Sequence, residues 1–139
     1  MKTIAFRLKP GQDLKRALKQ ATFSHNLQAA IILTAVGDLS RVALRFAGQS
    51  QTSVVKGPFE IVSLVGTFAA QGSHLHLSIA DESGAVQGGH LMDGTLVAQT
   101  VEVVIGELDD LVFTRELDDE SGWLELFIRD RESNDGASA

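Results

Sequence analysis

The chain has 139 residues, the size of one domain, and a chain of this length buries about 68% of the surface that its unfolded form exposes. Hydrophobic residues make up 44% of the sequence and charged residues 22%, which excludes a mainly disordered chain, a collagen-like fibre and a coiled-coil rod. There is no cysteine, so disulfide bonds, a thiolate nucleophile and cysteine-bound zinc or iron–sulfur clusters are also excluded. Any metal ligand must be histidine, aspartate or glutamate.

Charge is unevenly distributed along the chain, whose net charge is −6. Residues 1–56 contain nine Lys or Arg and two acids, residues 57–106 contain five acids and no base, and residues 107–139 contain three bases and eleven acids. Only the first segment therefore has the charge that a nucleic-acid surface requires, and the acids of the last segment repel phosphate unless they lie on the opposite face.

The sequence contains no apolar run of the roughly 18 residues that a membrane-spanning helix requires. Residues 1–25 also lack the basic start, apolar stretch and small-residue cleavage site of a signal peptide. We therefore expect a cytoplasmic protein.

The predicted elements begin with a strand and a helix. Residues 1–8 alternate between apolar and polar side chains, as in a half-buried strand, and Asp13 can cap a helix that follows the break at residues 10–11. The apolar stripe of this helix comprises Leu14, Ala17, Leu18 and Ala21. Its outward face carries Lys15, Arg16 and Lys19. These three side chains form either a solvated helix face or a surface that contacts phosphate.

A hairpin is predicted next. Residues 29–36 are almost wholly apolar, which favours a central strand buried on both faces, and they end at Gly37 and Asp38, a turn signal. Residues 42–46 then alternate like the second strand of a hairpin, and Arg41 shares a face with Arg45.

The rest of the chain is typical of a β-rich fold. Further strands are predicted at 59–68 and 75–79, which flank a turn at 71–73, and at 97–105, 111–117 and 123–128. Seven or eight strands and one main helix indicate the α+β class, as a single compact domain over residues 1–128 with a mostly antiparallel or mixed central sheet. Residues 129–139 are predicted to be a flexible acidic and polar tail.

Three histidines form a candidate metal site. His74 and His76 lie two residues apart on a predicted strand, so their side chains project to one face while the leucines between and after them point to the core. Gly88 and Gly89 allow the backbone that carries His90 to approach closely, and a neighbouring strand can bring its imidazole beside the other two. Three imidazoles with an open fourth position suit zinc or a similar divalent metal, which would hold their nitrogens within about 4 Å of one another.

Two alternatives to this site remain open. Two histidines in an HxH spacing also occur on solvent-facing strands without a ligand. An enzyme would additionally need a general base, for which Glu60, Asp81 and Asp93 are the nearest candidates in the sequence, although none has a known catalytic spacing.

A nucleic-acid surface is the third candidate. Arg41 and Arg45 can join the three basic residues of the helix, Lys15, Arg16 and Lys19, in one patch if the fold brings the two elements together. The alternative is that these five residues are scattered charges that keep the protein soluble.

Four ordered motifs resemble one known family. They are GPFEIVSLVGTF at 57–68, HLHLSIAD at 74–81, GAVQGGHL at 84–91 and VEVVIGEL at 101–108. This sequence is similar to the PPC domain, a "plants and prokaryotes conserved" domain long catalogued as a domain of unknown function. The resemblance covers about the whole chain and is strongest over 57–115.

The resemblance implies a compact α+β domain with a largely antiparallel sheet that assembles as a homotrimer. Plant members carry DNA-binding AT-hooks before the domain, and they contain a GRFEIL hexapeptide that is associated with partner binding. Prokaryotic members are described as DNA-binding proteins, and the histidines are typical of them. This sequence contains no AT-hook. Proline replaces arginine in its hexapeptide, which consists of Gly57, Pro58, Phe59, Glu60, Ile61 and Val62.

Six apolar residues of the predicted strands serve either as ordinary core or as surface buried between subunits. They are Phe59, Ile61, Leu64, Val101, Val103 and Ile105.

We expect a homotrimeric DNA-binding or regulatory module of the PPC type without catalytic activity. The alternative is a metal-dependent or small-ligand-binding protein, or an enzyme, that uses His74, His76 and His90.

Overall fold

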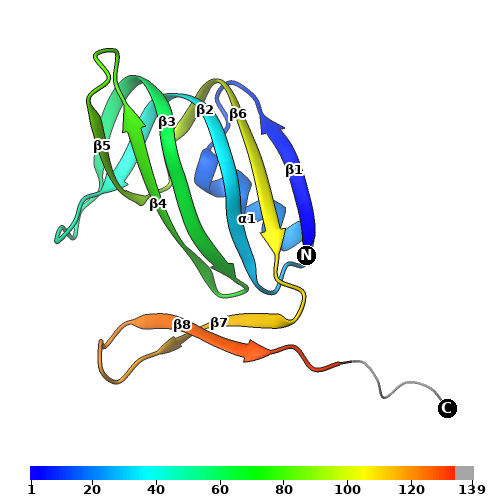
Figure 1. The fold of residues 1–139 in the computed structure, drawn as a ribbon. Coiled ribbons are helices and arrows are strands. Elements are labelled where there is room, and N and C mark those ends of the chain that lie inside the picture. Colours follow the sequence, from blue (N-terminus) through cyan, green and yellow to red (C-terminus); the bar gives the residue numbers. More distant parts are fainter. Residues whose placement is uncertain (134–139) are drawn as a thin grey trace.

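The structure is a computed structural model that describes residues 1–133, and these residues form two antiparallel sheets and one helix (Figure 1). The larger sheet has six strands in the order β1-β6-β2-β3-β4-β5, and β7 pairs with β8 in the smaller one. The elements are β1 (Lys2–Leu8), α1 (Leu14–Ser24), β2 (Ala30–Arg45), β3 (Ser53–Ala69), β4 (Gly72–Ala80), β5 (Val86–Leu91), β6 (Leu96–Glu107), β7 (Leu111–Leu117) and β8 (Leu124–Asp130). The predicted α+β class is confirmed. Over the described part of the chain, no helix is long and apolar enough to cross a membrane.

The large sheet curls until part of it closes. Besides pairing with β4, strand β5 pairs with the end of β2, where Leu44 lies opposite Leu91 and Arg45 opposite His90. Strands β2, β3, β4 and β5 therefore form a ring of hydrogen-bonded neighbours. Side chains that point into the curl, among them Leu77 and Ile79, are buried together with Leu44 and Leu91 in one hydrophobic core.

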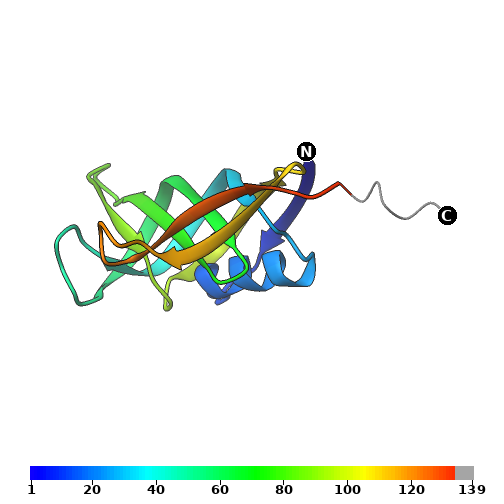
Figure 2. The ribbon, with the colours of Figure 1, turned by 90° about the horizontal axis from the view of Figure 1, so that it is seen from below.

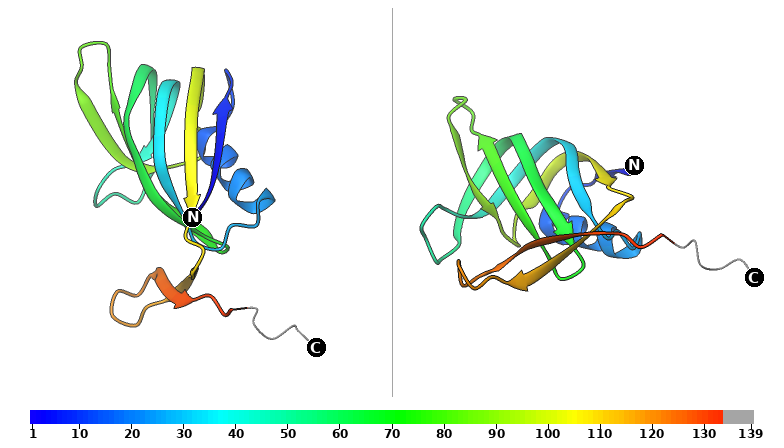
Figure 3. Two further views of the ribbon diagram at one scale, coloured as in Figure 1. Left: turned by 45° about the vertical axis from the view of Figure 1, so that its right-hand side comes forward. Right: turned by 60° about the horizontal axis from the view of Figure 1, so that its bottom comes forward.

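Helix α1 packs behind the large sheet in the view of Figure 1, as Figure 3 also shows from the side. It begins after Asp13, whose carboxylate accepts the backbone N–H of Arg16 at 3.1 Å and that of Gly94 at 2.7 Å. Leu14 and Leu18 are fully buried in the core, as the predicted stripe requires. The sequence thus places both the start and the buried face of α1 correctly.

The predicted hairpin around Gly37 is wrong, because β2 is one long strand that pairs with β3 on one side and β6 on the other. Gly37 lies inside this strand, and a Cβ at this position would clash with the backbone of Thr100 on β6. The carboxylate of Asp38 accepts the backbone N–H groups of Gln99 and Thr100 at 2.9 and 3.0 Å. The Gly-Asp pair therefore serves a close strand contact rather than a turn.

The strand predicted at 29–36 is also not buried on both faces. Leu33 is 43% exposed and Val36 is 53% exposed, so one face of this part of β2 is covered by neither helix nor hairpin. The predicted number of strands is nevertheless right. Two predicted strands merge into β2, and β5 is an additional strand where the sequence predicts none.

The β7–β8 hairpin crosses the lower end of the large sheet (Figures 1 and 2). Phe113 is buried, and its backbone N–H donates to the Gln28 carbonyl at 2.9 Å. Strand β8 extends to Asp130, and Arg131 forms an ion pair with Glu107 at 2.9 Å, so ordered structure continues past the predicted start of the tail at residue 129. Residues 134–139 of that tail lie outside the described residues.

Candidate metal centre

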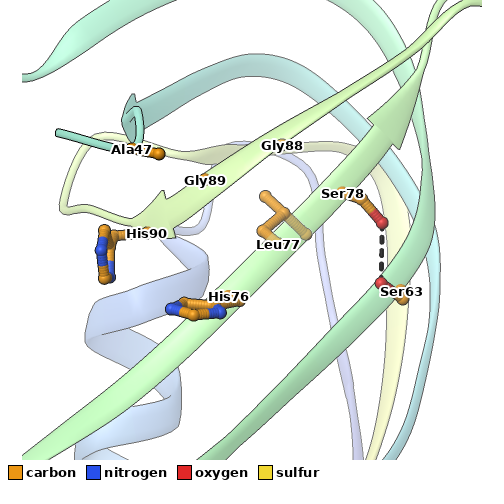
Figure 4. A pocket seen from close by; sticks show the side chains of 8 residues that line it. All are labelled: Ala47, Ser63, His76, Leu77, Ser78, Gly88, Gly89 and His90. Atoms are coloured by element: carbon orange, nitrogen blue, oxygen red, sulfur yellow. Dashed lines mark hydrogen bonds between the residues drawn. The ribbon is translucent and has the colours of Figure 1, made fainter. Parts of the chain in front are cut away.

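The three histidines of the predicted site meet on the outer face of the curled sheet. His74 and His76 project outward from β4, whereas Leu75 and Leu77 are buried, as the alternation predicts. His90 on β5 lies directly opposite His76 in the strand register. Figure 4 shows these two rings side by side.

The ring nitrogens of this cluster lie close together. The Nε2 atoms of His74 and His76 are 3.1 Å apart, and one nitrogen from each of the three rings lies within 4.8 Å of the others. The ring centroids are separated by 4.7 Å for His76 and His90 and by 5.5 Å for His74 and His90. A zinc ion with Zn–N bonds of roughly 2.0–2.1 Å needs separations below about 4 Å. The His74–His76 pair meets this limit, whereas the largest separation in the cluster, 4.8 Å, exceeds it.

Two glycines allow β5 to lie in the place that the site requires. A Cβ at Gly88 would lie 2.7 Å from the Leu77 carbonyl oxygen, and one at Gly89 would lie 2.8 Å from the Arg45 carbonyl oxygen. Both separations are too short for a side-chain carbon, so larger residues would push β5 away from β4 and from the end of β2. The close approach predicted for the Gly-Gly pair is confirmed.

The surroundings of His74 and His90 favour neutral imidazoles. Burial lowers the pKa of His74, and the neighbouring His76 and Arg115 lower it further, against an opposing effect of Glu125. Burial and the charge of Arg45 lower the pKa of His90. Since the neutral ring is the form that binds a metal, the lowered pKa values favour the metal-binding form of these two histidines.

The carboxylates suggested as general bases lie elsewhere. Asp81 accepts the hydroxyl and backbone N–H of Ser83 in the turn after β4, and Asp93 lies 3.7 Å from Arg16 near the start of α1. Glu60 is exposed on β3, opposite Ala80. None of the three lines the two hollows beside the histidines.

One of these hollows has a volume of about 550 Å³, and some of the residues that line it are not predicted as site residues from the sequence. The β7–β8 hairpin contributes Arg115, Trp123 and Glu125 to it, next to His74 and His90. Nothing in the local sequence of the hairpin marks these residues, because the fold brings them to β4 and β5 from a distant part of the chain. The other hollow, of about 320 Å³, is lined by His76, His90 and a pair of serines, Ser63 and Ser78, whose hydroxyl oxygens are 2.7 Å apart (Figure 4).

The five basic residues suggested for nucleic acid do not share one hollow or one set of partners. Lys15 and Arg45 line the larger hollow with the histidines, whereas Lys19 lines only a different hollow beside Phe23, which Lys15 also borders. Arg16 lies next to Asp93, and Arg41 donates to the Gly94 carbonyl at 3.1 Å in the same turn. Two of the five therefore belong to the histidine site.

The hexapeptide at 57–62 lies in β3 and alternates between the core and the surface. Phe59 and Ile61 are buried, whereas Pro58, Glu60 and Val62 are exposed.

Six apolar residues could serve either as core or as surface buried between subunits. All six are buried within one chain and serve as core: Phe59, Ile61, Leu64, Val101, Val103 and Ile105.

A curled antiparallel sheet, one packed helix and a histidine cluster on the outer sheet face define a small α+β domain with a candidate ligand site. Residues 1–109 match the Plants and Prokaryotes Conserved (PCC) domain, which is the PPC family that the four motifs resemble. The chain belongs to this family, and the β7–β8 hairpin lies beyond the matched residues.

Three individual proteins are similar to this chain. The solved structure of a hypothetical protein from Salmonella enterica is 44% identical, with a TM-score of 0.92, and the match covers 94% of this chain and 95% of that one. The "Bifunctional protein GlmU" of a Synechococcus strain is 40% identical over 93% of this chain, which covers 20% of that protein. The "AT-hook motif nuclear-localized protein 4" of Arabidopsis thaliana is 36% identical over 69% of this chain and 25% of that protein. The chain thus spans a quarter or less of the length of these two curated relatives.

Proposed function

We propose that this chain is a metal-binding PPC-domain module in which His74, His76 and His90 hold one divalent ion such as zinc. The observation that carries this proposal is the convergence of three imidazoles from two paired strands, with a nitrogen of each within 4.8 Å of the others. Chance alternation of side chains explains His74 and His76 on one strand, but it does not explain a third histidine placed in register opposite His76.

The chemistry of the donors also suits such an ion. Three neutral imidazoles leave a coordination position open, which is the arrangement of zinc sites that bind a water molecule or a ligand rather than only stabilise a fold. A bound divalent ion would supply Lewis acidity at that position. The histidines would hold the ion at the outer face of the sheet, where the two hollows give access to it.

Elemental analysis of the protein purified without an affinity tag tests this proposal. We expect about one divalent ion per chain in the wild type and a large loss in His76→Ala, because two imidazoles bind zinc much more weakly than three. His25→Ala is the matched control, since His25 ends α1 and contacts the Ala21 carbonyl rather than the cluster. Equal metal content in all three proteins would refute the site.

DNA binding is a second candidate function, supported by the relationship to the plant AT-hook protein and by the basic residues Lys15 and Arg45. A gel-shift titration at several salt concentrations tests it, because contacts to phosphates make binding fall steeply with salt. Lys15→Gln and Arg45→Gln should each weaken a genuine complex. Absence of a shift at low salt would leave only the metal-binding module.

We also propose that the module assembles as a homotrimer. The support for this is the apolar surface on β2 and β3 that the single chain leaves exposed, at Leu33, Val36, Val62 and Val65. Such surface is commonly buried between subunits.

A further inference from the structure

We infer that the larger hollow beside the histidines binds a small organic anion through its carboxylate or phosphate group, which occupies the open position of the proposed metal. This inference rests on the metal site proposed above and names the class of ligand that the site takes. Lys15, Arg45 and Arg115 are the residues that would hold the charged group.

The basic side chains and histidines of the hollow come from five elements. Lys15 comes from α1, Arg45 from the end of β2, His74 from β4, His90 from β5 and Arg115 from β7. Its volume of about 550 Å³ falls within the roughly 300–1,000 Å³ that is usual for small-molecule sites. A hollow of this size, with two of the three metal ligands in its wall, can present one small molecule to the metal.

The three basic side chains of the hollow have no acidic partner within residues 1–133, which the structure describes. The described residues form five ion pairs, and Lys15, Arg45 and Arg115 take part in none of them. Arg115 donates to the hydroxyl of Thr67 at 2.9 Å, but its buried Nε–H has no partner among the described residues. An arginine held in this way retains donors for a planar or tetrahedral anion.

The charges also lie close enough to the histidines to act on the same ligand. Lys15, Arg45 and Arg115 line the same hollow as His74 and His90, and Arg45 lies opposite His90 in the strand register. A metal ion would add further positive charge at this point. An anion bridging the metal and the arginines relieves this repulsion, whereas a neutral ligand would leave it uncompensated.

Two further features limit what the ligand can be. Glu125 is the acid in the wall of this hollow, where its carboxylate accepts the Ser121 hydroxyl at 3.1 Å, so three cations face one carboxylate. Trp123 and Leu124 add apolar surface beside it. A charged head group with a short organic part matches both features. The nucleic-acid backbone fits less well, because the basic side chains gather in a hollow rather than spread along a face.

Cobalt-substituted protein provides a direct test, because the visible absorption of Co²⁺ changes when a ligand enters its coordination sphere. The full chain is loaded with Co²⁺ and titrated with inorganic phosphate and, separately, with acetate at constant ionic strength. We expect a saturable spectral change with at least one anion, and the stronger response identifies which head group the site prefers. Arg45→Gln and Arg115→Gln should each weaken the apparent affinity by about tenfold, as expected for a lost charged hydrogen bond.

The control is Arg16→Gln, which removes the same charge from an exposed position beside Asp93 and should leave the titration unchanged. If the protein holds cobalt but neither anion alters its spectrum, the anion site is refuted and the metal site remains. The anion site is likewise refuted if both arginine variants titrate like the wild type. If the protein holds no cobalt, both proposals fall. Should Arg115→Gln misfold, Arg45→Gln, at a half-buried position, still decides the question.

Discussion

His74 and His90 resist protonation because their rings lose water and face other positive groups, which lowers the pKa of both. For His74 the largest effect is burial, followed by His76 and Arg115, and for His90 it is burial followed by Arg45. The folded chain therefore binds protons at these two rings less readily than the unfolded chain, where a histidine has a pKa of roughly 6.5. This difference links stability to pH even without a metal.

We predict that the metal-free protein loses stability as pH falls from about 7.5 to about 5.5. In this range the unfolded state takes up protons that the folded His74 and His90 resist, so the free energy of unfolding decreases toward low pH. Urea unfolding in the presence of a chelator measures the slope. The double variant His74→Gln/His90→Gln should have a shallower slope than the wild type, and equal slopes would contradict the prediction.

The β7–β8 hairpin is held to the main domain at both of its ends, and this is how its residues reach the histidines. At its start, the N–H of Phe113 donates to the Gln28 carbonyl. After its end, Arg131 pairs with Glu107, which is only 6% exposed and also accepts the backbone N–H of Gln28 at 2.8 Å. The ends of the hairpin thus fix the position of Arg115 between them.

Removal of the second attachment should destabilise the protein. Loss of one partner from a buried ion pair typically lowers the free energy of unfolding by about 3–5 kcal/mol. For Arg131→Ala we expect a smaller loss of about 2 kcal/mol, because Arg131 is 33% exposed and Glu107 still accepts a backbone N–H. Arg129→Ala is the matched control, since Arg129 pairs with Glu116 at the surface of the hairpin. Denaturant unfolding should give a clear loss for Arg131→Ala and a much smaller one for Arg129→Ala. Equal losses would indicate that the Glu107 pair does not anchor the hairpin.

The elements that can be predicted well from the sequence are those whose signals are local. Period-2 alternation identifies β4 and the outward direction of His74 and His76, and a capping residue with an apolar stripe identifies α1. Strand β5 is not predicted because Gly88 and Gly89 have no side chains to alternate, and their role becomes visible only once β4 and β2 lie against them. Arg115 reaches the site through pairings made far along the chain, which no local pattern encodes.

Apolar side chains are exposed on β2 and β3, the two longest strands of the large sheet. Leu33 and Val36 lie on β2, and Val62 and Val65 lie on its hydrogen-bonded neighbour β3. These four side chains are between 43% and 55% exposed. Val65 also lies opposite His76 on β4, so the apolar surface borders the candidate metal site. A subunit that covers this surface would lie beside the histidines.

We predict that the protein in solution has three times the mass of its 14.9-kDa chain, and that Val36→Lys shifts it toward the monomer. A lysine at this position would place a charge within the apolar surface, where burial against another subunit becomes unfavourable. Val54→Lys is the control, because Val54 is 61% exposed but lies toward the other end of β3, opposite Ala43. Sedimentation equilibrium over a range of concentrations gives the mass of each protein, and circular dichroism checks that each one is folded. A wild type that remains monomeric at all concentrations would contradict the trimer, and a Val36→Lys protein that stays trimeric would place the contact elsewhere on the molecule.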